Sequence, residues 1–398
     1  MVKFYRNLCE AVVQALESIF NENRYADRAL EKLLKQNPRW GSRDRRFIAE
    51  TTYDIVRWYR LLGYLSDTPN DFWRLMGTWF LLNKNPGLPP WREFSGLDAE
   101  LVFKKYEKAK QIRAVHESIP DWMDELCQRE LGSRWEKEIT SLNEEAEVVL
   151  RVNTLKNLRE ELQERLDEEN IQTEIVRDFS DALILSQRQN IFQQAAFKEG
   201  LFEVQDAGSQ AIAPFLNVEP GQRIVDACAG GGGKTLHLAA LMQNRGRIIA
   251  MDTEAWKLEE LKKRAKRAGA SNMIETRLIE STKTIKRLEG SADRVLLDVP
   301  CSGLGVLKRN PDAKWKLSLE AIEKGRETQQ MILRDYSSML KKGGLLVYST
   351  CSILPSENEK QVERFLGEHK DFQLLKQRMI YPSQGFDGFY MALIKKIG

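Results

Sequence analysis

Histidine and cysteine are scarce in this sequence, and their spacing excludes several kinds of site. None of the three histidines, His116, His237 and His369, has another plausible metal ligand beside it, which argues against a metal site and against Ser-His-Asp chemistry. The five cysteines are an odd number, lie far apart and form no Cys-x-x-Cys pair. This pattern argues against a disulfide framework and against a zinc knuckle. We therefore expect no metal.

Long apolar runs and strong charge are also missing. No stretch approaches the ~18 uninterrupted apolar residues that a membrane helix needs, and residues 1–10 do not form a cationic start before an apolar core. There is no internal repeat and no low-complexity tract, and the net charge of +3 permits a nucleic-acid partner without arguing for one. We expect a cytoplasmic monomer that has no membrane partner.

The first part of the chain predicts an all-helical domain over residues 1–140. Its apolar residues recur at helical spacing, for example at Leu8, Val12, Leu16 and Ile19. Turn signals at 37–38, 68–70 and 85–90 separate the expected helices. Arginines at 43, 45, 46, 57 and 60 fit two interpretations: a helix face that contacts RNA phosphates, or a solvated face with i,i+4 ion pairs.

The remainder predicts two further parts. Residues 145–205 contain short strands at 148–152 and 183–185 around a polar helix at 158–168, which indicates a small α/β subdomain. In residues 206–398 strands and helices alternate, which predicts an α/β fold with a parallel sheet and right-handed crossovers. The expected strands are 223–228, 247–252, 273–278, 293–299, 344–351 and 389–395, and the expected helices include 253–268 and 319–340.

Chemically reactive side chains follow two of these strands. Asp298 and Cys301 follow strand 293–299, and Cys351 ends strand 344–351. Open α/β sheets bind ligands at the carboxyl ends of their strands, so we expect these residues to face one crevice. A thiolate is a nucleophile when its surroundings are cationic or hydrogen-bonding. Cys9 and Cys127 instead fit buried packing positions.

A third strand ends in four glycines, Gly230, Gly231, Gly232 and Gly233, followed by Lys234. A Walker loop would need glycine where Cys228 stands, and a GxGxxG loop would need glycine at Thr235. The remaining interpretation is a nucleoside-cofactor loop of the S-adenosylmethionine type, for which Asp252 supplies the ribose-binding acid at the end of the next strand. A lysine at a helix start is unfavourable unless it is paired, so we expect Lys234 to pair with Asp298.

Several stretches resemble the RNA cytosine-5 methyltransferases of the Nop/Sun family. The resemblance lies in the Pro-Cys motif at 298–315 and the Thr-Cys motif at 348–359, and further in 151–156, 205–210 and 387–394. The chain is most similar to the bacterial Sun/Fmu (RsmB-type) branch, which methylates small-subunit rRNA and begins with a NusB-like helical domain. The resemblance implies a Rossmann-like methyltransferase sheet, preceded by that helical domain and a small α/β subdomain.

The resemblance also implies roles for individual residues. Cys351 would add to carbon 6 of cytosine, Cys301 would assist product release, and Asp298, held or tuned by Lys234, would bind the ring nitrogen edge. S-adenosylmethionine would contact Cys228, Ala229, Gly230, Gly231, Gly232, Gly233, Lys234, Asp252, Lys257, Glu280 and Asp298. RNA, unstacked at the target base, would contact Arg151, Asn153, Pro300, Lys308 and Arg309.

Two positions depart from the family pattern and keep alternatives open. Gly231 stands where the family usually has proline, which predicts a looser loop, and Glu280 stands where the family has an aspartate. One alternative is therefore a non-catalytic RNA-binding ribosome-assembly factor, and another is a methyltransferase for tRNA. A DNA cytosine methyltransferase would also use a Pro-Cys motif, but it fits the Thr-Cys motif and the helical front domain less well than an RNA methyltransferase does. The basic run at 262–267 is expected to be a solvated helix face.

Overall fold

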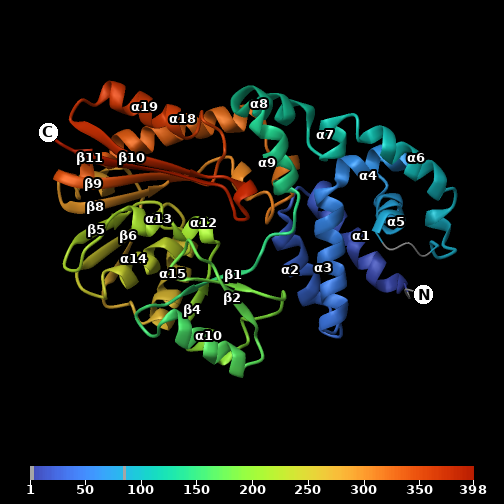
Figure 1. Ribbon diagram of the computed structural model, residues 1–398, viewed down its shortest axis with the longest axis horizontal. Coiled ribbons are helices and arrows are strands. Elements are labelled where there is room, and N and C mark those ends of the chain that lie inside the picture. Colours follow the sequence, from blue (N-terminus) through green and yellow to red (C-terminus); the bar gives the residue numbers. More distant parts are fainter. Residues whose placement is uncertain (1–3, 84–86) are drawn as a thin grey trace. The chain divides into compact units, whose positions relative to one another are not determined.

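The computed structural model describes residues 4–83 and 87–398, and its contacts divide the chain into two units (Figure 1). The helical unit comprises Met1–Glu144 and Leu307–Ser318, and the sheet unit comprises Glu145–Val306 and Leu319–Gly398. The sequence had divided the chain at similar points but into three consecutive parts. Part of the turn expected at 85–90 lies outside the described residues.

The helical unit is held together by amphipathic helices. Its elements are α1 (Arg6–Phe20), α2 (Ala26–Gln36), α3 (Ser42–Arg57), α4 (Tyr59–Ser66), α5 (Phe72–Asn83), η1 (Arg92–Phe94), α6 (Ala99–Ala109), α7 (Arg113–His116), α8 (Asp121–Leu131), α9 (Arg134–Leu142) and α17 (Ala313–Lys316). The four apolar residues predicted to share one face of α1 are all buried. Because residues three and four apart lie on the same side of a helix, this spacing places them in one core.

The arginine-rich stretch does not form a single basic face. Arg57 is buried and donates to the carbonyl oxygen of Lys308 (2.9 Å). Arg60 donates to the Ile119 carbonyl and to Asp121, whereas Arg46 pairs with Glu50 one turn along its helix. Of the two interpretations of these arginines, a solvated face with i,i+4 ion pairs is confirmed for Arg46. Both Arg57 and Arg60 thus donate hydrogen bonds to other residues of the helical unit.

Residues Leu307–Ser318, here called the insert segment, pack into the helical unit although most of them belong to the Pro-Cys motif at 298–315, which begins in the sheet unit. The ammonium of Lys314, which is fully buried, donates to the carbonyl oxygens of Arg57 (3.2 Å) and Ser118 (3.3 Å) and to Asn143. The indole of Trp315 donates to the Val56 carbonyl (2.7 Å). The insert segment therefore supplies hydrogen-bond donors that the helical unit's own backbone needs.

The sheet unit begins with a small antiparallel sheet of four strands in the order β2-β3-β1-β4. The strands are β1 (Val149–Val152), β2 (Thr173–Ile175), β3 (Ala182–Leu185) and β4 (Phe202–Val204), and helices α10 (Arg159–Glu168) and α11 (Ala195–Lys198) accompany them. The sequence predicted β1, β3 and α10. It missed β2 and β4, each only three residues long, because such short strands show too little alternation to be recognised.

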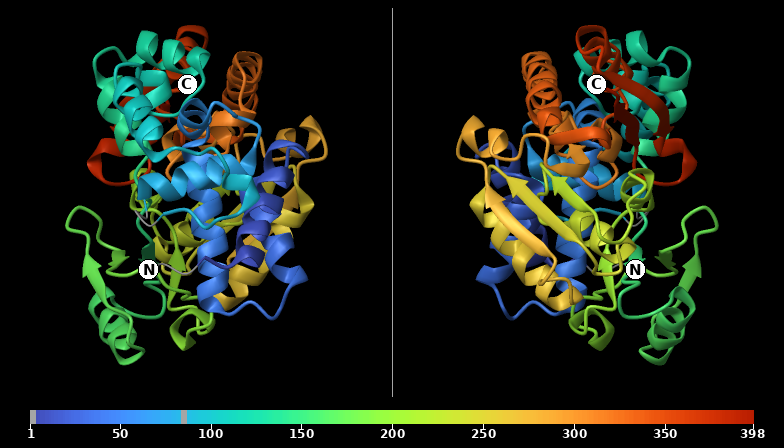
Figure 2. Two further views of the ribbon diagram at one scale, coloured as in Figure 1. Left: turned by 90° about the vertical axis from the view of Figure 1, so that its right-hand side faces the viewer. Right: turned by 90° about the vertical axis from the view of Figure 1, so that its left-hand side faces the viewer.

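The large sheet has seven strands in the order β10-β11-β9-β8-β5-β6-β7. They are β5 (Arg223–Asp226), β6 (Arg247–Asp252), β7 (Ile274–Leu278), β8 (Ala292–Asp298), β9 (Leu340–Thr350), β10 (Phe372–Ile380) and β11 (Phe389–Lys396). Strands β5 to β9 pair in parallel, as predicted, but β11 is antiparallel to both β9 and β10. The sequence missed β10, an edge strand whose middle residues are exposed and polar. The side views in Figure 2 show the twist of this sheet.

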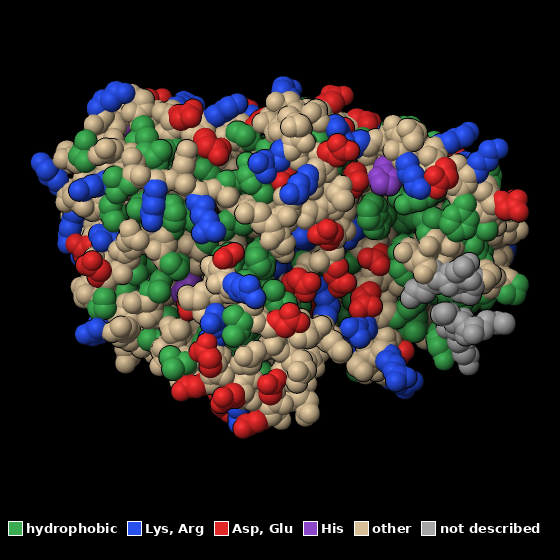
Figure 3. Space-filling model, viewed as in Figure 1, with side chains coloured by type: hydrophobic (Ala, Val, Ile, Leu, Met, Phe, Trp, Pro, Cys, Tyr) green, Lys and Arg blue, Asp and Glu red, His purple; other side chains and the backbone are tan. Residues whose placement is uncertain are grey.

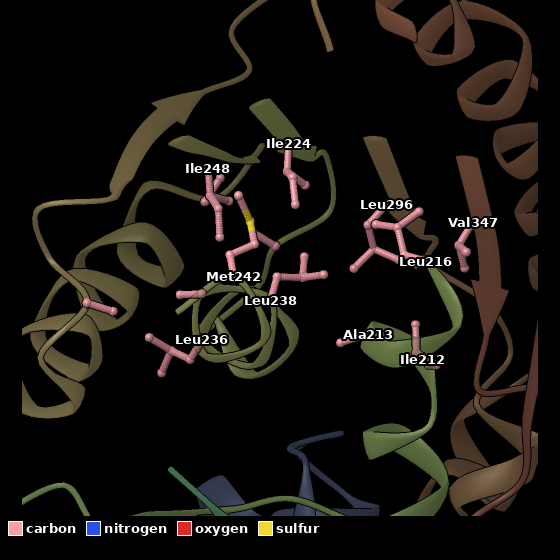
Figure 4. Packing of buried hydrophobic residues seen from close by; sticks show 14 of the residues in the cluster. Ile212, Ala213, Leu216, Ile224, Leu236, Leu238, Met242, Ile248, Leu296 and Val347 are labelled. Atoms are coloured by element: carbon pink, nitrogen blue, oxygen red, sulfur yellow. The ribbon is translucent and has the colours of Figure 1, made fainter. Parts of the chain in front are cut away.

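Helices cover both faces of the large sheet (Figure 1). On one face lie α12 (Ala207–Gln210), α13 (Ile212–Phe215), α14 (Gly233–Leu241) and α15 (Ala255–Ala268), and on the other lie α16 (Thr282–Lys286), α18 (Leu319–Tyr336) and α19 (Glu359–Glu368). Figure 4 shows Leu238 of α14 and Met242, which directly follows this helix, packed toward Ile224 and Ile248 of the strands. Burial on both sides explains the nearly continuous apolar runs of β5, β6 and β8.

We predict that Lys314→Met lowers the free energy of unfolding by about 3 kcal/mol, because it leaves buried acceptors without a donor. Urea denaturation of the whole chain would measure this. Lys316→Met is the matched control, since Lys316 also donates to a carbonyl, that of Ile19, but is only half-buried. An equal loss in both variants would contradict the assignment.

Candidate active site

The site forms where β5, β8 and β9 end side by side. Asp226 of β5 pairs with Leu296 of β8, and Asp298 of β8 pairs with Ser349 of β9. The loops that follow these three strands therefore leave the same edge of the large sheet. This confirms the expectation that the glycine run and the two Cys motifs meet at one edge.

Lys234 and Asp298 form the ion pair that the sequence predicted. The Lys234 ammonium lies 2.6 Å from Asp298 Oδ2, and the Ser349 hydroxyl donates to Oδ1 (2.9 Å). Burial disfavours the charged ammonium, but the adjacent Asp298 carboxylate outweighs it and raises the pKa of Lys234. Lys234 is therefore cationic at neutral pH, and both oxygens of Asp298 are held in a fixed orientation.

The two motif cysteines lie in contact. Their Sγ atoms are 3.3 Å apart, and both side chains are half-buried. The hydrogen bond to Cys351, together with burial, raises the pKa of Cys301 well above the ordinary thiol value. Cys301 is thus held as a neutral thiol beside Cys351.

A buried carboxylate that the sequence reasoning missed ties both cysteine loops together. Glu357 is fully buried and accepts hydrogen bonds from the Ser302 amide (2.9 Å), from the hydroxyls of Ser302 and Ser352, and from Gln329 (3.0 Å). Ser302 and Ser352 directly follow Cys301 and Cys351. The repeated Cys-Ser pair was the available signal, since a serine at the same place in two loops suggests a shared acceptor.

The glycine loop, residues 230–233, has the shape of a cofactor cradle. Gly230 (φ 52°) and Gly232 (φ 87°) take left-handed conformations, and a side chain on Gly232 would meet Leu261 at 2.5 Å. The Gly230 amide donates to Asp252 Oδ2 (2.9 Å), and Asp252 ends β6, as predicted. A Cβ on Gly230 would meet nothing within 4 Å, so the space above the loop is open.

These residues fit a nucleoside cofactor. Asp252 also accepts from the Glu254 amide (2.9 Å) and lies 3.8 Å from the Lys257 ammonium. Leu278 at the end of β7 pairs with Asp252, and the exposed side chain of Glu280 follows two residues later. Cys228 is half-buried, and burial raises its pKa well above the usual value, so it is a neutral packing residue. Ala229 is buried and donates its amide to the Met251 carbonyl (2.9 Å).

The structure argues against direct RNA contact for three predicted residues. Arg151 and Asn153 are 2% and 5% exposed, and Asn153 donates to the carbonyls of Gly200 and Ala268. Lys308, in the helical unit, is 4% exposed and donates to Glu144 (3.1 Å). Their polar groups are used inside the fold because buried donors require partners. Pro300 is exposed and Arg309 is partly exposed.

Two arginines of the basic run at 262–267 also point inward. Lys262 and Lys263 are exposed and pair with glutamates of their own helix, as expected of a solvated face. Arg264 and Arg267 instead pair with the buried Glu203 of β4, so the prediction is wrong for these two. The face of the molecule drawn in Figure 3 carries both basic and acidic side chains.

A Rossmann-like sheet with a glycine loop and an acid after the second strand is the architecture of S-adenosylmethionine-dependent methyltransferases, the class to which this protein belongs. More particularly, the chain belongs to the RsmB/F family of 16S rRNA methyltransferases, whose model matches residues 213–395. A second model, the ferredoxin-like domain of RsmF/B-like methyltransferases, matches residues 119–192. The sequence resemblance to the Sun/Fmu (RsmB-type) branch is thereby confirmed.

Individual relatives agree with this family. The chain is 33% identical to the probable ribosomal RNA small subunit methyltransferase B of Synechocystis sp., over 90% of this chain and 88% of that protein. The crystal structure of PH0851 matches with a TM-score of 0.84 and 25% identity, covering 99% of this chain and all of that one. NSun6 from Pyrococcus horikoshii, solved with the cofactor analogue SFG, matches with a TM-score of 0.65 and 22% identity over 71% of this chain and 99% of that one.

Between residues 4 and 83 and between 87 and 398, no helix is long and apolar enough to cross a membrane. In the same described part of the chain, no group of three or more His, Cys, Asp or Glu side chains is placed to hold a metal ion.

We predict that Glu357→Gln reduces kcat at least about tenfold, because its amide nitrogen cannot accept from the serine hydroxyls and both cysteine loops lose one fixed point. Methyl transfer at saturating cofactor would measure this. Glu359→Gln, two residues along the same segment, is the control and should retain activity. Equal activities in the two variants would show that the loops do not depend on Glu357.

We predict a pH-dependent effect for Asp226→Asn. Burial raises the pKa of Asp226 to about 7, so its stabilising contribution is complete below its unfolded pKa of 3.8 and is lost as pH rises through 7. Asparagine does not titrate, so the stability of the variant relative to the original protein should rise by on the order of 3 kcal/mol from pH 4 to pH 8.

Thermal denaturation at several pH values would measure the change. Asp293→Asn provides a control with the opposite shift: despite its partial burial, the hydrogen bond from Lys341 lowers the pKa of Asp293, so its relative stability should not change between pH 5 and pH 8. A pH-independent difference for Asp226→Asn would refute the prediction.

Proposed function

We propose that this rRNA methyltransferase transfers a methyl group to carbon 5 of a cytosine in small-subunit rRNA through a covalent adduct between Cys351 and carbon 6. The observation that carries the proposal is the pair of sulfurs 3.3 Å apart beside the Lys234–Asp298 ion pair. Carbon 5 of cytosine is a weak nucleophile, so a methyl transfer to it requires prior activation of the ring. Two neighbouring thiols and an oriented carboxylate suit that chemistry.

The first step is addition of the Cys351 thiolate to carbon 6. The new S–C bond moves the ring's electron pair to carbon 5, and charge develops on the ring nitrogen edge. The Asp298 carboxylate, fixed by Lys234 and Ser349, is oriented to accept a hydrogen bond from the exocyclic amino group on that edge, and the Lys234 ammonium supplies positive charge beside it. Bound S-adenosylmethionine supplies the methyl group that carbon 5 accepts.

The second step is release of the product, and Cys301 is suited to it. The largest cause of its raised pKa is the hydrogen bond with Cys351, and this cause disappears when Cys351 becomes bonded to carbon. Cys301 then gives its proton to water more easily, and its thiolate can remove the proton from carbon 5. The electron pair left at carbon 5 restores the C5–C6 double bond and expels the Cys351 thiolate.

Base access and RNA contact follow from the same geometry. The target base must leave its stack to reach sulfurs at the end of a strand, which suits an unpaired region. Pro300, exposed beside Cys301, and Arg309 are the proposed RNA contacts among those predicted. S-adenosylmethionine would be held by the glycine loop and Asp252, with Lys257 and Glu280 beside them.

The decisive experiment is bisulfite sequencing of rRNA and tRNA from cells that lack the gene, rescued with the original protein or with Cys351→Ala. We expect one small-subunit rRNA cytosine mark to disappear and to return only with the original protein. Cys301→Ala should accumulate RNA covalently bound to protein on a denaturing gel, and the Cys301→Ala/Cys351→Ala variant should show none.

Other outcomes separate the alternatives. Loss of a tRNA mark instead would keep the reaction and replace the substrate. Absence of any lost mark would favour a non-catalytic assembly factor, and rescue by Cys351→Ala would refute the covalent mechanism.

A further inference from the structure

Two arginine side chains donate hydrogen bonds to the backbone of the glycine loop, residues 230–233. Arg264 Nη1 of α15 donates to the Gly231 carbonyl (2.7 Å), and Arg151 Nη1 of β1 donates to the Gly233 carbonyl. Both acceptors belong to the four consecutive glycines that form the cofactor cradle. Because glycine loses more conformational freedom on folding than any other residue, such a loop needs external contacts to keep one shape.

The Arg264 side chain is itself fixed. Its Nε and Nη2 atoms lie 3.2 and 3.0 Å from Glu203 Oε2, and only about a fifth of the side chain is exposed. Glu203 lies on β4 of the small sheet, and its other oxygen accepts from Arg267. A guanidinium held through two of its nitrogens has a defined plane, so its remaining nitrogen presents a donor to Gly231 at a fixed place.

We propose that Arg264 is a positioning residue that holds the glycine loop in its cofactor-binding shape. Its hydrogen bond restricts the backbone conformation at Gly231, as the ring of a proline at that position would. The small sheet then has a role in cofactor binding, because its Glu203 orients Arg264. This role concerns S-adenosylmethionine alone and does not depend on which nucleotide is methylated.

The matched pair Arg264→Gln and Arg267→Gln tests the proposal. Both arginines lie on α15, bind Glu203 and are about equally buried, but only Arg264 reaches the loop. Calorimetric titration of the full chain with S-adenosylmethionine, without RNA, should show about a tenfold higher Kd for Arg264→Gln and less than a twofold change for Arg267→Gln. Thermal denaturation confirms that each variant is folded.

Steady-state kinetics distinguishes positioning from a general loss of structure. Arg264→Gln should raise KM for S-adenosylmethionine by a similar factor while kcat at saturating cofactor changes less than twofold. Equal Kd values for the two variants, or an unchanged Kd for Arg264→Gln, would overturn the proposal.

A second variant tests the same contact from the other side. A Cβ on Gly231 would lie 3.2 Å from Arg264 Nη1, and the backbone there is not left-handed, so Gly231→Ala should displace the guanidinium and raise the Kd severalfold. In an Arg264→Gln background the alanine should add little further loss. Additive losses would show that the two residues act independently and would overturn the proposal.

Discussion

The parallel pairing of β5, β8 and β9 is the constraint on which the site depends. Each strand is buried on both faces, so its register is fixed by packing, and polar side chains can be placed only where the strand ends. Lys234 from the start of α14, Asp298 from β8, and the two sulfurs from the loops after β8 and β9 therefore lie at one edge of the sheet. These residues are up to 117 positions apart in the sequence, from Lys234 to Cys351.

At that edge of the sheet, side chains of the same residue type have different electrostatic surroundings. Asp298 sits beside an ammonium and a hydroxyl, whereas Asp226, one strand away and buried without a cation in contact, titrates near 7. Cys301 is likewise held as a thiol by burial and by its hydrogen bond with the neighbouring Cys351. The environment of each side chain, more than its residue type, thus sets the pKa of Asp226 and of Cys301.

The predicted parts of the fold carry a clear apolar pattern. Strands β6 and β8 and helix α15 followed from their apolar residues, and the Lys234–Asp298 pair followed from the neighbouring ends of parallel strands. Strand β10 could not be predicted because its exposed middle carries no alternation, and β2 and β4 are too short. The role of Arg264 and the burial of Arg151 depend on contacts between residues 33 and 82 positions apart, which no local pattern encodes.

The insert segment has a consequence for how the protein is made. The helical unit is formed by the first 144 residues together with residues 307–318, so its last donors, on Lys314 and Trp315, are synthesised after most of the sheet unit. Domains generally fold as units during synthesis, beginning from the N-terminus. Here the helices are synthesised before the donors that their buried carbonyls bind in the folded protein, and those donors follow about 160 residues later. The helical unit can therefore be completed only after most of the sheet unit has been synthesised. An exchange of helical domains between relatives would have to transfer both residues 1–144 and residues 307–318.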